Sequence, residues 1–241
     1  VERQPALGPG GTVGVALIRG DVNVVAMGTL TQTEGKTVLA FGHPMMGLGE
    51  VNLPMVSGRV HTIVPSLSNS MKLVSPLAEI GAVLQDLPCG IVGEIGRRAP
   101  VVPIEVTVVA REGQRRLFSA QVALHRRLLP LLASAVVSSA LAETEPDVTD
   151  MIVTLHTRLQ VRGTGSLDVL AQLASTEGLS TRTLSQSRGL KALADLMGNP
   201  FSPAVLERMQ VDVKIEYRHD VAEIVGASLP DERVKPGDVI A

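Results

Sequence analysis

The chain has 241 residues, enough for one large domain or two modest ones, and a net charge of −2. The near-neutral charge and an aromatic content of only 2% argue against a nucleic-acid partner, which would need basic patches and stacking rings. The single cysteine excludes an internal disulfide, and a hydrophobic content of 45% predicts a sizeable core of aliphatic side chains and methionine.

The first half of the chain has the pattern of successive β-strands. Residues 12–19, 22–31 and 37–41 are rich in aliphatic and β-branched residues, and the turn at 34–36 makes them an antiparallel meander. Seven to nine strands without a convincing helix predict a closed or nearly closed β-barrel. The later segments of this half are a loop at 45–57, a strand at 59–65, a short apolar segment at 77–85, and strands at 91–95, 101–110 and 115–124.

His43 lies between Gly42 and Pro44, directly after the third predicted strand. Glycine permits unusual backbone angles and proline cannot continue a strand ladder, so the imidazole is held on a constrained loop. A titratable histidine in this position can act as a general base. The alternative is a loop histidine bonded to a nearby carbonyl.

An ordered series of short motifs between residues 11 and 124 resembles the SpoIVB-type serine peptidases (serine peptidase family fifty-five). No single motif is specific, but their order is. The resemblance implies a peptidase barrel, similar to half of a chymotrypsin-like fold, with His43 as the general base. The motifs are G-T-L-T at 28–31, A-F-G-H-P at 40–44, S-G-R-V at 57–60, I-G at 80–81, G-I-V-G at 90–93 and P-I-E-V at 103–106.

The chain departs from the family pattern at two points. The family has an acid a few positions after the histidine, whereas residues 44–47 here are Pro-Met-Met-Gly, so Glu50 and Asp86 are the possible substitutes. The family's nucleophile lies in a G-M-S-G-S-P motif in a second barrel, and this chain has no such motif. Either the serine lies in a segment outside these residues, or the site has decayed and the barrel serves another role.

Other chemistries have weaker support in the sequence. Cys89 lies in an apolar run and is better interpreted as a buried thiol than as a nucleophile. Lys72 among serines 66, 68, 70 and 75 could form a Ser–Lys dyad, but serine-rich segments are usually simple loops. His61 on a predicted strand is interpreted as structural. The five histidines are dispersed and form no metal-ligand pair, so we expect neither a metal nor a cofactor.

The composition changes after residue 125. Apolar residues recur at helical spacing over 128–142, a segment too short to span a bilayer, and an amphipathic helix is predicted over 185–197. Strands are predicted at 151–161, 166–173, 205–217 and 221–228. Together these elements predict an α+β or sandwich-like module.

The expected fold is therefore mainly β with a few helices. An antiparallel barrel occupies residues 1–125, an α+β module 128–230, and a following segment begins at 231–241. Because the sequence opens at Val1 and its last residues look like a strand cut short, we expect a fragment of a longer protein.

Two functions follow from these expectations. The first is a piece of a bacterial SpoIVB-like serine endopeptidase outside the cytoplasm, in the periplasm, the envelope or the medium. It would supply His43 to a site completed by another segment of the polypeptide and would act on a protein or peptide. The alternative is a non-catalytic β-rich binding or structural module of a bacterial envelope or secreted protein.

Overall fold

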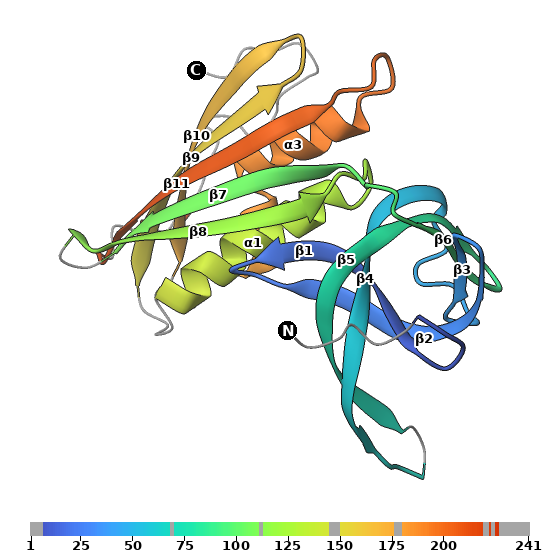
Figure 1. Cartoon of the computed structure of the whole chain (residues 1–241). Helices are drawn as coiled ribbons and strands as arrows, with labels where there is room; N and C mark the ends of the chain where they lie inside the picture. The colour runs from blue at the N-terminus through green and yellow to red at the C-terminus, as the bar shows by residue number, and fades with distance from the viewer. Residues whose placement is uncertain are drawn as a thin grey trace.

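A computed structural model describes residues 7–67, 70–110, 113–144, 150–175, 180–218, 222 and 225–226. Eleven strands form one continuous sheet that closes into a barrel at one end and opens into a helix-covered layer at the other (Figure 1). The strands are β1 (Thr12–Gly20), β2 (Val24–Glu34), β3 (Thr37–Ala40), β4 (Gly49–Val64), β5 (Met71–Leu87), β6 (Gly90–Ile95), β7 (Val101–Val109), β8 (Arg115–Ala123), β9 (Met151–Val161), β10 (Gly165–Ser175) and β11 (Leu206–Glu216). The helices are α1 (Leu129–Thr144), α2 (Thr181–Ser185) and α3 (Arg188–Gly198).

Six strands close the barrel in the order β1-β2-β3-β6-β5-β4, because β4 pairs with β1 as well as with β5. All pairs in this ring are antiparallel. Met55 of β4 is fully buried, and its side chain packs where Gly81 and Gly93 leave room for it. A sequence almost without aromatic residues thus fills its barrel with methionine and branched aliphatic side chains.

The second layer is a five-stranded sheet in the order β8-β7-β11-β9-β10. Strands β7 and β11 are parallel, and the other pairs described in this layer are antiparallel. The layer joins the barrel through a short antiparallel pairing of β1 with β8, from Ile18 opposite Val122 to Gly20 opposite Ala120. β1 therefore joins the two layers, because it pairs with barrel strands and with β8.

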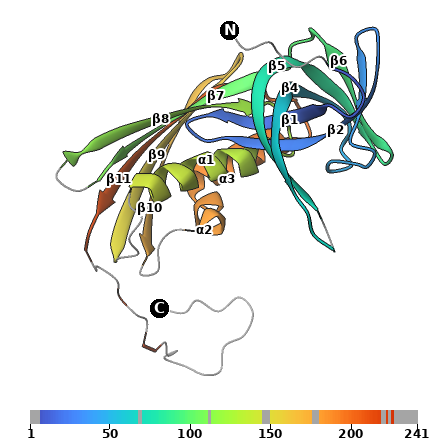
Figure 2. The ribbon, with the colours of Figure 1, turned by 60° about the horizontal axis from the view of Figure 1, so that its bottom comes forward.

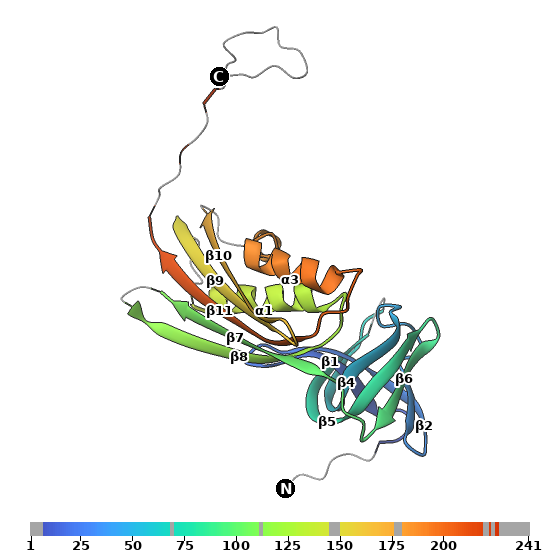
Figure 3. The same cartoon turned by 90° about the horizontal axis from the view of Figure 1, so that it is seen from above.

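The helices cover one face of the second sheet (Figure 3). Helix α1 packs on β7 and β8 and also against α2 and α3, which explains why its sequence is apolar on most sides. Helix α3 packs on β9 and β10 and buries Leu190, Leu193 and Met197, and its exposed side carries the Lys191–Asp195 ion pair. None of the helices in the described residues is long and apolar enough to cross a membrane.

The expected fold class, mainly β with an antiparallel barrel followed by an α+β module, is confirmed. The helices predicted over 128–142 and 185–197 correspond to α1 and α3. The strand predicted over 221–228 and the segment 231–241 lie largely or wholly outside the described residues.

Two details differ from expectation. Strands β7 and β8 were expected to complete the barrel, but they pair with β11 and carry α1, so the second layer begins before residue 125. The glycine- and proline-rich segment 45–57 was expected to be a loop, but most of it belongs to β4, and β5 is likewise longer than the short segment predicted at 77–85. In both cases long-range pairing outweighs the local propensity of the sequence.

Candidate functional site

The loop that carries His43 leaves β3 through an unusual residue. Phe41 has a φ of +75°, and its backbone amide donates to the Thr29 carbonyl at 2.8 Å. The Phe41 ring lies over Gly28, where any side chain at position 28 would overlap it. The motif at 28–31 and the motif at 40–44 are therefore in contact. The Phe41 ring occupies the space that Gly28 leaves by having no side chain.

Asp86, near the end of β5, anchors this loop by accepting hydrogen bonds from its backbone amides. Its side chain is buried, and its carboxylate accepts from the amides of Met45 at 2.7 Å, Met46 at 2.9 Å and Leu48 at 3.1 Å. Burial opposes the charge, but the hydrogen bonds from these amides and from that of Gly47 outweigh it, so the pKa of Asp86 lies below its ordinary value. A charged carboxylate at this position fixes the backbone of the loop.

His43 itself is exposed at the start of the loop. Its Nδ1 lies 2.8 Å from the Pro44 carbonyl oxygen, so Nδ1 carries the donated proton, and in the neutral ring the lone pair is on Nε2. The Phe41 ring lies beside the imidazole, with 5.8 Å between ring centroids. Nε2 of His43 is thus the nitrogen that could take a proton from an incoming group.

No carboxylate contacts the His43 ring in the part of the chain that the structure describes. Asp86 lies against the same loop but serves the backbone amides. Glu50, the other acid considered, is exposed near the start of β4, where it pairs with Gln85 of β5. The structure brings His43 and Asp86 to one loop without joining their side chains.

A serine and a histidine do meet elsewhere, on β4 and β5. His61 Nε2 lies 2.8 Å from Ser75 Oγ, and both side chains are exposed. Among the described residues no acid bonds to His61, so this pair lacks the group that would orient and charge-stabilise an imidazole in a catalytic triad. Lys72, considered for a Ser–Lys dyad, instead donates to Thr29 Oγ1 at 2.7 Å.

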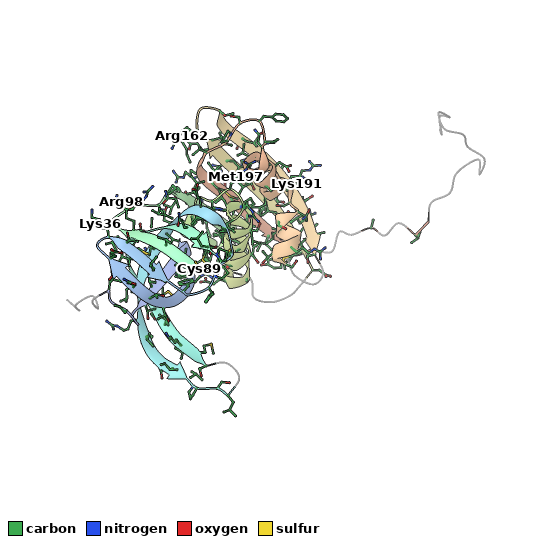
Figure 4. All side chains as sticks on the ribbon, turned by 90° about the vertical axis from the view of Figure 1, so that its right-hand side faces the viewer. Lys36, Cys89, Arg98, Arg162, Lys191 and Met197 are labelled. Carbon is green, nitrogen blue, oxygen red and sulfur yellow. The ribbon has the colours of Figure 1, made fainter. Side chains whose placement is uncertain are left out.

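Cys89 lies in the turn between β5 and β6 and is exposed at the surface of the barrel, not buried as its apolar flanks suggested (Figure 4). The next residue, Gly90, runs so close to β3 that a side chain there would lie 2.7 Å from the Ala40 carbonyl oxygen. The described residues contain no cluster of His, Cys, Asp or Glu that could hold a metal ion.

One feature of the fold was not predicted from the sequence. Beyond the barrel, β4 and β5 continue as a two-stranded projection, which we call the arm and define as residues 59–67 and 70–76 (Figures 1 and 2). Near its tip Ser70 Oγ bonds to both the amide and the carbonyl of Ser66. The signal was present in the aliphatic residues at 60, 63, 64, 71 and 73, but the serines between the two runs suggested a loop.

The open face of the second sheet carries a chain of charged pairs across its strands. Arg208 on β11 binds both carboxylate oxygens of Glu105 on β7 at 2.6 Å, and Arg158 on β9 pairs with Asp212 on β11. His156 Nε2 lies 3.0 Å from the Asp168 carboxylate. Each of these polar side chains has a partner on a neighbouring strand, which indicates a role in joining strands.

No protein-family model matches the chain, and no curated protein matches it. Among solved structures, a superantigen-like protein from Staphylococcus aureus in complex with sialyl-Lewis X is 11% identical, over 78% of this chain and 83% of that one, with a TM-score of 0.20. A second structure of a superantigen-like protein from the same organism is 9% identical, over 86% and 93%, also with a TM-score of 0.20. A TM-score this low carries no argument about fold or function, and the SpoIVB-type resemblance stays a prediction.

Proposed function

We propose that this chain is a non-catalytic β-rich binding module of a bacterial envelope or secreted protein, built on a peptidase-like barrel. The observation that carries the proposal is the use of Asp86. A general-base histidine needs an acid that orients its ring and stabilises the charged form. The buried acid that contacts the His43 loop, Asp86, is committed to backbone amides at 2.7–3.1 Å.

The geometry fits a structural role for the loop. The Asp86 carboxylate holds the backbone of the loop through its amides. Nδ1 of His43 donates to the Pro44 carbonyl, an ordinary local contact for a loop histidine. A binding module needs exposed side chains on a rigid scaffold, and the arm offers them.

A second candidate is the peptidase fragment, with His43 as general base and the serine elsewhere in the protein. It is favoured by the lone pair that Nε2 of His43 keeps and by the rigid loop on which the ring lies. In this case an incoming segment would have to bring both the nucleophile and the orienting group.

A fluorophosphonate probe separates the two, because it reacts with a serine only where a neighbouring base activates it. The full-length gene product and its His43→Ala variant are labelled in parallel, and His61→Ala is the matched control for the exposed histidine bonded to Ser75. We expect no labelling that depends on His43. Labelling of the natural protein that disappears in His43→Ala and persists in His61→Ala would overturn the proposal and establish the peptidase.

A further inference from the structure

The arm concentrates exposed apolar surface in a short stretch of chain. Of the sixteen large hydrophobic side chains exposed in the described residues, six lie on the arm. Leu67 at the tip is fully exposed, and Ile63 and Met71 are 58% and 59% exposed. The other members are Val60, Val64 and Leu73. Exposed apolar side chains concentrated on one projecting element mark a site of interaction with a protein or a membrane.

The apolar residues occupy both faces of the arm. Val64 pairs with Met71 and Ile63 pairs with Lys72, and neighbouring pairs in a ladder point to opposite faces. One face therefore carries Val64, Met71 and Leu73, and the other carries Ile63 with the stem of Lys72. A protein partner seated on a flat ribbon would cover one face, whereas a lipid surface surrounds a projecting tip on all sides.

The charges on the arm point to the same partner. Residues 59–76 contain no Asp or Glu and carry Lys72, although the chain as a whole is acidic, with a net charge of −2. The Lys72 amine donates to a neutral hydroxyl, that of Thr29, so this contact does not cancel its charge. Positive charge beside exposed aliphatic side chains complements an anionic headgroup layer.

We propose that the arm docks on an anionic lipid bilayer, with Leu67, Ile63 and Met71 at the boundary between headgroups and acyl chains. The unpaired edges of a two-stranded ribbon cannot enter hydrocarbon, so only the tip is immersed, by roughly 5–10 Å. This inference rests on the proposed binding function and names its partner as a membrane surface. Figure 4 shows the arm projecting from the barrel, clear of the helix-covered sheet.

The absence of tryptophan from the sequence allows a direct test. A Leu67→Trp variant of the whole chain carries one tryptophan, at the tip, and Phe201→Trp places one at another exposed site, 95% exposed, outside the arm. The vesicles are phosphatidylcholine with roughly one-third phosphatidylglycerol, and phosphatidylcholine alone. We expect a blue shift of the indole emission of Leu67→Trp with anionic vesicles and none with neutral vesicles. The emission of Phe201→Trp should shift with neither.

Co-sedimentation with the same vesicles measures the contribution of individual residues. The double variant Ile63→Thr/Leu67→Ser should weaken binding about tenfold or more, and Lys72→Gln about fivefold. The matched control Leu170→Thr removes a side chain that is 63% exposed on β10 and should leave binding unchanged. Because all these side chains are exposed, the unfolding midpoint of each variant should match the parent and exclude misfolding as the cause.

Two results would overturn the inference. One is an unshifted indole emission of Leu67→Trp together with vesicle binding that is absent or insensitive to the arm variants. The other is self-association that depends on protein concentration and is lost in Ile63→Thr/Leu67→Ser without any vesicle binding, which would make the partner a second copy of the chain. A serine labelled in a His43-dependent way would instead remove the proposed function and leave the vesicle result standing.

Discussion

At the scale of single residues, the loop that carries His43 depends on the fit between Gly28 and Phe41. We expect Gly28→Ala to destabilise the protein by about 1–3 kcal/mol, because a methyl group there would overlap the Phe41 ring. Urea unfolding measures the effect, and Gly198→Ala, at a glycine with open space around it, is the control that should cost far less. If the cost of Gly28→Ala stays the same in a Phe41→Ala background, the overlap is not its cause.

The hydrogen bonds that the Asp86 carboxylate accepts should contribute to stability in a pH-dependent way. Asp86→Asn should lower the free energy of unfolding by about 3 kcal/mol, since an amide group cannot accept all the hydrogen bonds that the buried carboxylate accepts. Because the pKa of Asp86 is lower in the folded state, its stabilisation is present above pH of about 4 and is lost as the pH falls through the lowered value. If the free energy of unfolding of the parent and of Asp86→Asn decreased equally steeply as the pH falls below about 4, the role of the Asp86 charge would be contradicted.

His125 also predicts a loss of stability as the pH falls, although here the folded state favours the neutral form of the side chain and not the charged form. Burial, and then the charge of Arg127, hold the pKa of His125 below its ordinary value, so the folded state favours the neutral ring. Stability should be complete above pH of about 6.5 and should fall as the pH drops through that value towards the lowered one. His125→Gln should flatten this part of the stability curve, whereas His43→Gln, at an exposed site, should leave it intact. Equal slopes in the parent and in His125→Gln would refute the assignment.

At the scale of elements, the pair of parallel strands β7 and β11 is held by more than backbone bonds. Hydrogen bonds from Arg208 and then Gln210 lower the pKa of Glu105. A double-mutant cycle on Glu105→Gln and Arg208→Ala should give a coupling energy of about 1 kcal/mol, typical of an exposed ion pair; here one guanidinium nitrogen contacts both carboxylate oxygens. The same cycle on the exposed pair Lys191 and Asp195 should give a smaller coupling energy. A coupling energy of zero for Glu105 and Arg208 would mean that only backbone hydrogen bonds hold the two strands together.

Elements with a local signature were predictable from the sequence. Helices α1 and α3 follow from helical spacing of apolar residues, and the β2–β3 turn from its glycine. The arm was not predictable in this way, because its strands pair across a serine-rich segment that resembles a loop. The exposure of Cys89 also depends on a turn whose surroundings no local pattern shows.

At the scale of the whole molecule, the presence of a barrel was predictable from the sequence, but which strands form it was not. The parallel pairing of Ile104 with Met209 joins segments about a hundred residues apart, and it draws β7 and β8 away from the barrel. The candidate site shows the same limit. His43 and Asp86 were both identifiable as polar residues of interest, but only the closed barrel shows that the carboxylate meets backbone amides.

Asp86 serves the loop backbone and leaves the His43 ring without an orienting acid. Amide hydrogen exchange is the decisive test of this assignment. We predict that the amides of Met45, Met46 and Leu48 exchange slowly in the parent and rapidly in Asp86→Asn, while the amides of β7 are unchanged. Protection of these three amides that persists without the Asp86 carboxylate would contradict the account, and would free that acid for the histidine of a peptidase.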